Sequence, residues 1–450
     1  MIICAIAGSV ALTQSFSDAL FSLALLPVFY VLIVFANSQL QKNKPGHYVV
    51  MLFLWAFAAR LLAVYIFGEV LTEYIGMPFL SNKDDLVYDQ VSSEIADRWR
   101  SSGLGFYDDI RFSTGVYSGF PNFSAALKYL FGNSPYVPRI GNAFLSAISC
   151  VTAYKICRSY ASPGEAKLVG IIFLFSPLLI TFASLQLKDT LLLFLTLTAI
   201  NANVKILKGK INAIVLLQFI LSLFFMAFIR TAAILPVIGA FIFTLIFTRR
   251  KNKVSITVLA IALVCCLIYI WSYISITSGV DIEHYFSSRY EVLSTRTISD
   301  TDAGIASTSL GKLVGTPIYL ITGLFLPAPT IVGLPNAETI NYDMFGVIFH
   351  YSLLPFLCIS FFRSIKRRKE MVVPFFLAMV FLLLKVGQAT STMAILSPRQ
   401  SLSTMFVMYL MLPLCFDDIG KRRTRSIIIC ATIVVMIGYA IVRLYSRGLI

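Results

Sequence analysis

The sequence predicts an all-α protein, a polytopic transmembrane helical bundle that forms a single membrane-embedded domain over residues 1–450. Hydrophobic residues make up 58% of the chain and charged residues only 13%, which is too little charge to cover the surface of a soluble protein of this length. Apolar runs of about 17 to 23 residues recur throughout, each long enough to cross a hydrocarbon core. The period-two alternation of β-barrel strands is absent.

The basic residues predict which connections face the cytoplasm. The formal net charge is +15, and six short gaps between apolar runs hold 21 of the 37 basic residues but only four of the 22 acidic ones. Cytoplasmic loops of membrane proteins carry such an excess of lysine and arginine. We therefore place these gaps in the cytoplasm and disfavour a nucleic-acid-binding function. The gaps are 42–44, 155–167, 205–210, 249–253, 363–370 and 417–425.

The apolar runs between these gaps predict about 12–13 spans. The predicted spans lie near residues 19–36, 48–70, 140–157, 167–184, 190–206, 212–229, 232–248, 254–276, 343–362, 371–388, 401–416 and 426–445, and residues 1–13 are too short to count with them. Residues 313–335 are also apolar, but a span there would place the basic gap at 363–370 outside. Four prolines also break that segment, so we expect a re-entrant segment.

Two long polar stretches face the outside in this topology. Residues 71–139 form a large outer loop with interfacial helices, because 86–99 have amphipathic helical spacing. Residues 277–342 form a second outer loop that includes the re-entrant segment. The eight cysteines lie mostly in apolar runs and form no CxxC motif, so we expect small core residues.

Acidic residues supply the candidate catalytic groups. Asp84 and Asp85 follow the second span directly, and a carboxylate beside lipid is suited to act as a general base. Alone, an Asp-Asp pair is equally compatible with a solvated loop. Together with Asp89, the pair could share a divalent cation with a substrate phosphate. No metal site is otherwise evident, since His284 and His350 lack ligand spacing.

Basic residues at the outer ends of spans supply candidate substrate-binding groups. Lys188 and Asp189 form a very short outer turn, Arg230 lies in another, and Arg399 follows a proline at the start of a helix. Such cations can bind a lipid-linked phosphate, or they can merely extend to lipid headgroups. Arg60 and Lys385 lie deeper within spans, where charged residues usually have a function. The second outer loop adds Arg289 and Arg296.

The region from 80 to 200 resembles bacterial GT-C glycosyltransferases, which use polyprenyl-phosphate sugars and are related to protein mannosyltransferases and the aminoarabinose transferase. The matching features are the Asp84-Asp85 pair, the helix entry from Phe131-Gly132 through Arg139 and Asn142, and the Lys188-Asp189 turn. Arg399 corresponds to the late arginine of that family. The resemblance implies a GT-C-like fold and an inverting sugar transfer.

These observations lead to one hypothesis and two rivals. The hypothesis is a glycosyltransferase of the bacterial inner membrane that transfers a sugar from an undecaprenyl-phosphate-linked donor to a cell-surface glycan or lipid. Asp84 or Asp85 would deprotonate the acceptor, and Lys188, Arg230 and Arg399 would hold the departing phosphate. The nearest rival is an O-antigen repeat-unit polymerase that depends more on its arginines. A lipid-linked oligosaccharide flippase or transporter is the other.

Overall fold

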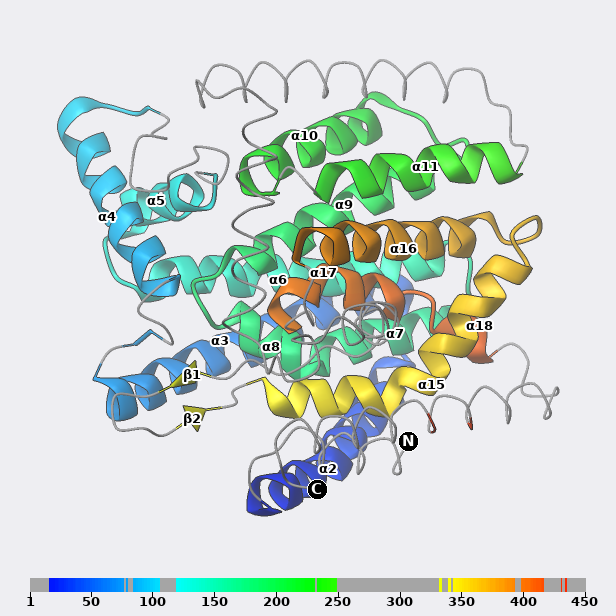
Figure 1. Cartoon of the computed structure of the whole chain (residues 1–450), viewed down its shortest axis with the longest axis horizontal. Helices are drawn as coiled ribbons and strands as arrows, with labels where there is room; N and C mark the ends of the chain where they lie inside the picture. Colours follow the sequence, from blue (N-terminus) through cyan, green and yellow to red (C-terminus); the bar gives the residue numbers. More distant parts are fainter. Residues whose placement is uncertain are drawn as a thin grey trace, which may run out of the picture.

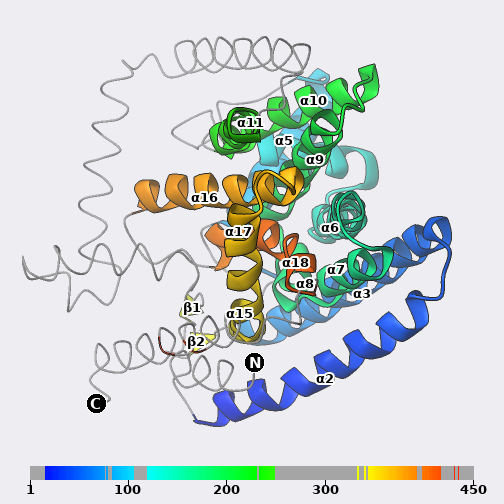
Figure 2. The ribbon, with the colours of Figure 1, turned by 90° about the vertical axis from the view of Figure 1, so that its right-hand side faces the viewer.

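The computed structural model describes residues 16–76, 78–79, 84–105, 119–230, 233–248, 332–333, 339–340, 343–392 and 398–416, together with 430 and 434. These residues are almost entirely helical, and the predicted polytopic helical class is confirmed. Helices α2 and α3 lie on one side of the bundle, and α10 and α11 lie on the opposite side (Figures 1 and 2). Helices α6, α8, α9 and α17 lie between them.

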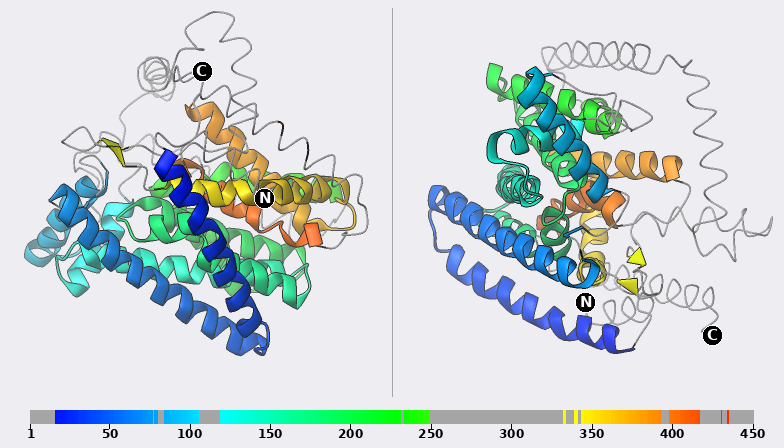
Figure 3. Two further views of the ribbon diagram at one scale, coloured as in Figure 1. Left: turned by 90° about the horizontal axis from the view of Figure 1, so that it is seen from below. Right: turned by 90° about the vertical axis from the view of Figure 1, so that its left-hand side faces the viewer.

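The first two described helices are long and present apolar side chains to the outside. Helix α2 spans Phe16–Leu40 and α3 spans Pro45–Ile75. Pro45 suits the first position of α3, where a backbone N–H would have no helical partner. The helix ends at Gly76, whose φ of 79° is left-handed and whose N–H donates to the Thr72 carbonyl. Seen from below, α2 and α3 lie at an oblique angle and meet at the connection between them (Figure 3).

The predicted large outer loop contains two helices that pack against each other at one end of the molecule (Figure 1). Helix α4 spans Asp85–Ser102, and α5 spans Gly119–Phe131. A buried lysine joins them: Lys128 Nζ lies 2.6 Å from Asp89 Oδ1 and 2.7 Å from Ser93 Oγ. Burial lowers the pKa of Lys128, and the hydrogen bond and charge of Asp89 offset part of that effect. The pair fixes α5 to α4.

Helices α6 to α9 form the centre of the bundle. Helix α6 spans Tyr136–Arg158, α7 spans Pro163–Phe175, α8 spans Pro177–Ala183 and α9 spans Lys188–Leu207. Ser162 and Glu165 form a reciprocal capping box at the start of α7. The predicted span 167–184 corresponds to α7 and α8, which bend by 50° at Ser176. The cause is Pro177, which lacks an N–H and cannot continue α7.

The buried Arg60 stabilises this bend. Because Pro177 has no N–H, the Phe173 carbonyl lacks its ordinary helical donor. The guanidinium of Arg60 supplies one instead: NH2 lies 3.0 Å from the Phe173 oxygen, and NH1 lies 3.4 Å from the Leu174 oxygen. Its Nε donates to Ser146 Oγ on α6 at 2.6 Å. Arg60 thus links α3 and α6 to the break between α7 and α8.

The remaining described elements complete the bundle. Helix α10 spans Ala213–Arg230, α11 Ile234–Thr248, α15 Met344–Lys366, α16 Val372–Thr392, α17 Pro398–Tyr409 and α18 Pro413–Phe416. Strands β1 (Val332–Gly333) and β2 (Thr339–Ile340) pair antiparallel, with Val332 opposite Ile340. Helix α17 packs against α9 and α16, which places its first residues beside the start of α9.

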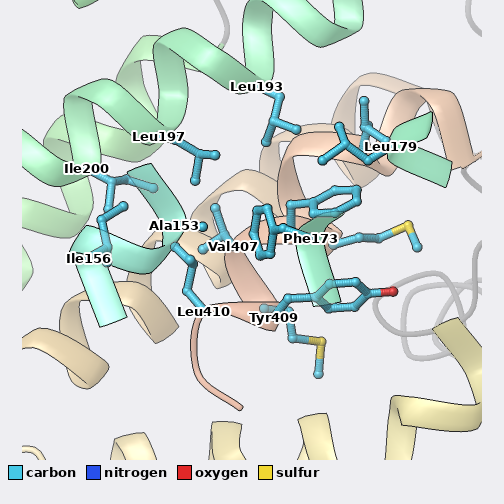
Figure 4. Packing of buried hydrophobic residues seen from close by; sticks show 14 of the residues in the cluster. Ala153, Ile156, Phe173, Leu179, Leu193, Leu197, Ile200, Val407, Tyr409 and Leu410 are labelled. Atoms are coloured by element: carbon cyan, nitrogen blue, oxygen red, sulfur yellow. The ribbon is translucent and has the colours of Figure 1, made fainter. Parts of the chain in front are cut away.

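One continuous hydrophobic core fills the space between these helices (Figure 4). Phe173 of α7 makes edge-to-face contacts with Phe406 and Tyr409 of α17, with ring centroids 4.9 and 6.3 Å apart. Leu193 and Leu197 of α9 cover the same group. Since α17 is held on both sides, the position of Arg399 at its start is set by the core.

Within the described part of the chain, five helices are long and apolar enough to cross a membrane, or six if α7 and α8 count as one bent span. The five are α3, α6, α9, α10 and α15, and shorter apolar helices lie at Tyr30–Leu40, Ile234–Phe247 and Val372–Val386. The predicted spans 254–276 and 426–445 are not included, since both lie essentially outside the described residues, as does nearly all of the predicted re-entrant segment.

Candidate active site

Three residues predicted from distant parts of the sequence meet in one ion-pair cluster. Arg399, at the start of α17, donates from Nε to Asp189 Oδ2 at 2.8 Å. Its NH1 pairs with Asp84 Oδ2, at the start of α4. The two carboxylates differ in environment: the side chain of Asp189 is 7% exposed and that of Asp84 is 44% exposed. The Arg399–Asp189 pair is therefore the buried anchor, and Asp84 is the accessible acid.

Two more predicted cations lie beside this cluster. Lys188 is the first residue of α9, and Arg230 is the last residue of α10. Lys188 is within electrostatic range of Asp189, Arg399, Arg230 and Asp84. Both cations are partly exposed. Arg399 and Lys188 lie close to both carboxylates and Arg230 lies close to Lys188, so positive charge exceeds negative charge beside the accessible Asp84.

The turn that carries Lys188 and Asp189 is held by α6. Asn142 donates its amide hydrogens to the carbonyls of Leu185 and Leu187, at 2.8 and 3.0 Å. These two carbonyls belong to the connection between α8 and α9, so neither is satisfied within a helix. Between them, Gln186 reaches Ser92 of α4 at 3.4 Å. Asn142 and Gln186 therefore fix the position of Asp189 relative to α6 and α4.

Asp84 and Asp85 occupy different environments although they are adjacent. Asp84 precedes the first turn of α4, whereas the Asp85 residue is 1% exposed and one of its oxygens accepts from the Leu86 N–H. Asp85 lies within electrostatic range of Arg139 on α6, which is fully buried. The geometry therefore assigns the two acids different positions: Asp84 faces the cation cluster, and Asp85 faces the interior below it.

The other predicted residues lie elsewhere. Arg60 is buried between α3, α6 and α7, away from the Arg399 contacts. Lys385 on α16 is buried and donates to Ser401 Oγ at 3.2 Å. His350 on α15 is hydrogen-bonded to the Tyr409 hydroxyl at 3.0 Å. Arg289, together with Arg296 and His284, lies outside the described residues.

Two features of the site were not given a role from the sequence. Arg139 and Asn142 belong to the matching helix entry, but the sequence did not show that Asn142 holds the Lys188-Asp189 turn. Gln186 was not identified as a candidate from the sequence. The three-residue spacing of Arg139 and Asn142 places both on one face of α6, which is the signal that could have linked them.

The described residues do not favour a metal site at this position. No group of three His, Cys, Asp or Glu side chains gathers within the described ranges. Of the carboxylates that the sequence suggested for a shared divalent cation, Asp84 pairs with Arg399 and Asp89 pairs with Lys128. We therefore derive no step that depends on a divalent cation.

Comparison with known proteins identifies the fold. No protein-family model matches the chain, and no curated protein matches it in sequence. Among solved structures, the apo form of the oligosaccharyltransferase of Archaeoglobus fulgidus is similar, with a TM-score of 0.51 and 12% identity over 88% of this chain and 56% of that chain. Two further structures of the same organism's enzyme also match. These are a complex with an inhibitory peptide and a dolichol-phosphate (TM-score 0.44, 12% identity, 87% and 56% coverage) and a form tethered to an acceptor peptide (0.45, 12%, 86% and 55%).

The fold is therefore of the GT-C type, as the sequence resemblance predicts. The chain spans just over half the length of the oligosaccharyltransferase that it matches. The apolar helices and this fold together define a multi-pass membrane protein.

Proposed function

We propose that this protein is a membrane glycosyltransferase that transfers a sugar from an undecaprenyl-phosphate-linked donor to a cell-surface glycan or lipid. We place the reaction on the outer face of a bacterial inner membrane. The observation that carries the proposal is the cluster of Asp84, Arg399 and Asp189, with Lys188 and Arg230 beside it. The GT-C type fold, shared with an oligosaccharyltransferase, supports the reaction class.

The cations suit the donor phosphate. A phosphate binds well to a fork of guanidinium N–H groups and to nearby ammonium charge. Arg399 is held in place by the buried Asp189, so its second guanidinium edge is oriented before substrate arrives. Positive groups fixed in advance where negative charge develops stabilise a departing anion. Lys188 adds to this effect because it lies within electrostatic range of Arg399, and Arg230 lies within range of Lys188.

Asp84 suits the role of general base. In the proposed step, Asp84 accepts the proton of the acceptor hydroxyl, whose oxygen attacks the anomeric carbon and forms the new glycosidic bond. The bond between that carbon and the phosphate oxygen breaks, and its electron pair leaves with the lipid phosphate. Attack opposite the leaving group inverts the anomeric centre. When the phosphate engages Arg399, the guanidinium is drawn from Asp84 and frees the carboxylate oxygen.

Other residues hold the catalytic side chains in position. We propose that Asn142 and Gln186 act as positioning residues for Asp189, and that Arg60 stabilises the bend between α7 and α8 rather than binding substrate. Asp85 is too buried to reach an acceptor hydroxyl in the described arrangement, so Asp84 is the assigned base.

A complementation experiment tests the proposal. The gene is deleted in its own cells, and surface glycans and glycolipids are profiled by mass spectrometry. We expect one sugar to be lost, and wild-type protein to restore it. Asp84→Asn should not restore it at equal membrane abundance, whereas Asp97→Asn should. Asp97 is a matched control because it lies on the same helix, 61% exposed, and pairs with Arg100 away from the cluster. Full restoration by Asp84→Asn would contradict the assignment.

A further inference from the structure

Arg139 is a buried cation whose hydrogen-bonding groups have no partner among the residues that the structure describes. The residue is 0% exposed, and Nε and both terminal nitrogens of its guanidinium lack an acceptor among the described residues. Burying polar groups without hydrogen bonds is costly, so such groups in a native protein require an explanation. Arg60, equally buried, makes five hydrogen bonds. Arg139 therefore differs from a purely structural arginine of the same bundle.

Unpaired acceptors lie on the same part of the fold. Asn142, one turn further along α6, uses its amide hydrogens but leaves Oδ1 buried and without a donor. Gln186 lies between the two carbonyls that Asn142 binds, and its Oε1 is also buried and without a donor. Among the described residues, three donor nitrogens of one guanidinium and two amide oxygens are thus unsatisfied around the start of α6.

The surroundings of Arg139 are aromatic and acidic. Its guanidinium carbon lies 5.3 Å from the centre of the Phe79 ring and 5.8 Å from that of Tyr136. Asp85 and Asp89 of α4 lie within electrostatic range. Because Asp85 directly follows Asp84, this group adjoins the reaction site. The neighbouring carboxylates disfavour a second phosphate here.

The chemistry of the unpaired groups indicates the ligand. An ionised phosphate only accepts hydrogen bonds, so it would leave the two amide oxygens unpaired. A hydroxyl both donates and accepts, and a sugar carries several hydroxyls. Aromatic rings beside such groups suit the apolar face of a sugar ring. We propose that Arg139, Asn142 and Gln186 form a subsite for the hydroxyl groups of a carbohydrate, next to Asp84. This inference rests on the proposed function, and the carbohydrate is that of the donor lipid or of the acceptor.

Charge-conserving and neutral variants test the subsite. Arg139→Lys keeps the positive charge beside Asp85 but loses the planar fork of donors. Gln186→Met removes the unpaired Oε1 at similar volume, together with the 3.4 Å contact of Nε2 with Ser92. Arg100→Lys is the matched control, because Arg100 is exposed on α4 and its two terminal nitrogens are paired with Asp97, Asn133 and the Lys128 carbonyl. Thermal unfolding of each full-length protein checks that it folds.

The readout is the lipid that each protein retains when purified from its own cells, followed by sugar transfer in membranes. For a donor sugar, the ratio of sugar-bearing to sugar-free polyprenyl phosphate should fall at least about tenfold in Arg139→Lys and Gln186→Met, but not in Arg100→Lys. For an acceptor sugar, the ratio should stay constant and transfer should fall by a similar factor.

If both test variants retain the lipid and transfer the sugar as the wild-type protein does, the subsite proposal is overturned. Arg139 would then only balance the charge of Asp85 and Asp89. If Arg139→Lys fails to fold, the same measurements on Gln186→Met test the subsite. If the wild-type protein neither retains a polyprenyl phosphate nor transfers a sugar, the proposed function itself fails, and the subsite fails with it. The two failures are therefore distinguishable.

Discussion

Substituting Asp84 by Asn should separate lipid-phosphate binding from sugar transfer. In the proposed mechanism, Asp84 and the donor phosphate compete for the same guanidinium edge of Arg399, whose NH1 pairs with Asp84. Asparagine keeps the shape of the side chain and an oxygen that accepts a hydrogen bond, but it removes the charge. The variant thereby weakens the competitor while leaving Arg399 anchored to Asp189.

The expected gain in affinity is small and the expected loss in rate is large. The Asp84 side chain is 44% exposed, so solvent screens its pair with Arg399, and such pairs contribute about 0–1 kcal/mol. At about 1.36 kcal/mol per tenfold, the affinity for undecaprenyl phosphate should rise by at most about fivefold. Loss of a positioned general base should lower the transfer rate by about 10²- to 10⁴-fold.

The binding assay titrates purified protein in detergent with undecaprenyl phosphate and follows bound lipid by native mass spectrometry. Asp97→Asn serves as the control for the same change of charge on the same helix. It should leave both binding and transfer unchanged, since the exposed Asp97 pairs only with groups remote from Arg399. A fall in lipid affinity with Asp84→Asn would refute the competition for Arg399. A normal transfer rate in Asp84→Asn would refute the role of Asp84 as the general base.

Three further predictions concern the residues that support the site. Asn142→Asp replaces two amide donors by an anion facing the Leu185 and Leu187 carbonyls, so transfer should fall more than tenfold while lipid binding falls less; an unchanged rate would exclude its positioning role. Arg60→Met leaves the Phe173 carbonyl without a donor and should lower the unfolding temperature, with transfer per folded molecule retained; a loss of lipid affinity would instead support substrate binding by Arg60. Lys128→Met leaves Asp89 without its buried partner and should lower the free energy of unfolding by about 3–5 kcal/mol. Adding Asp89→Asn should restore part of that loss in thermal unfolding. No loss in the single variant would show that the pair is not needed to join α4 and α5.

Local patterns in the sequence predicted most of the helices and the residues of the cluster. The spans near 48–70, 140–157, 190–206 and 212–229 coincide with α3, α6, α9 and α10, because long apolar runs between charged gaps determine such helices. The short Lys188-Asp189 turn and the position of Arg399 after Pro398 were also visible locally. Each pointed to the end of a helix, where charged groups gather.

The contacts between these residues could not be predicted in the same way. Arg399 is 315 residues from Asp84 and 210 residues from Asp189 in the chain, and only the packing of α17 against α9 brings them together. The sequence also did not distinguish Asp84 from Asp85, because their burial depends on how α4 packs. The bend at Pro177 was overlooked because the apolar run continues through it, although a proline in that position breaks a helix.

The identity of the lipid that co-purifies with the wild-type protein tests the proposed function most directly. Mass spectrometry of gently purified protein should detect a polyprenyl phosphate that carries a sugar. Lys188→Gln should retain less of it, because it removes one of the three cations that we propose to hold the phosphate. Equal retention by this variant would contradict the assignment of the phosphate site. A wild-type protein that retains no phosphate-bearing lipid, and does not take up added undecaprenyl phosphate, would contradict the account as a whole.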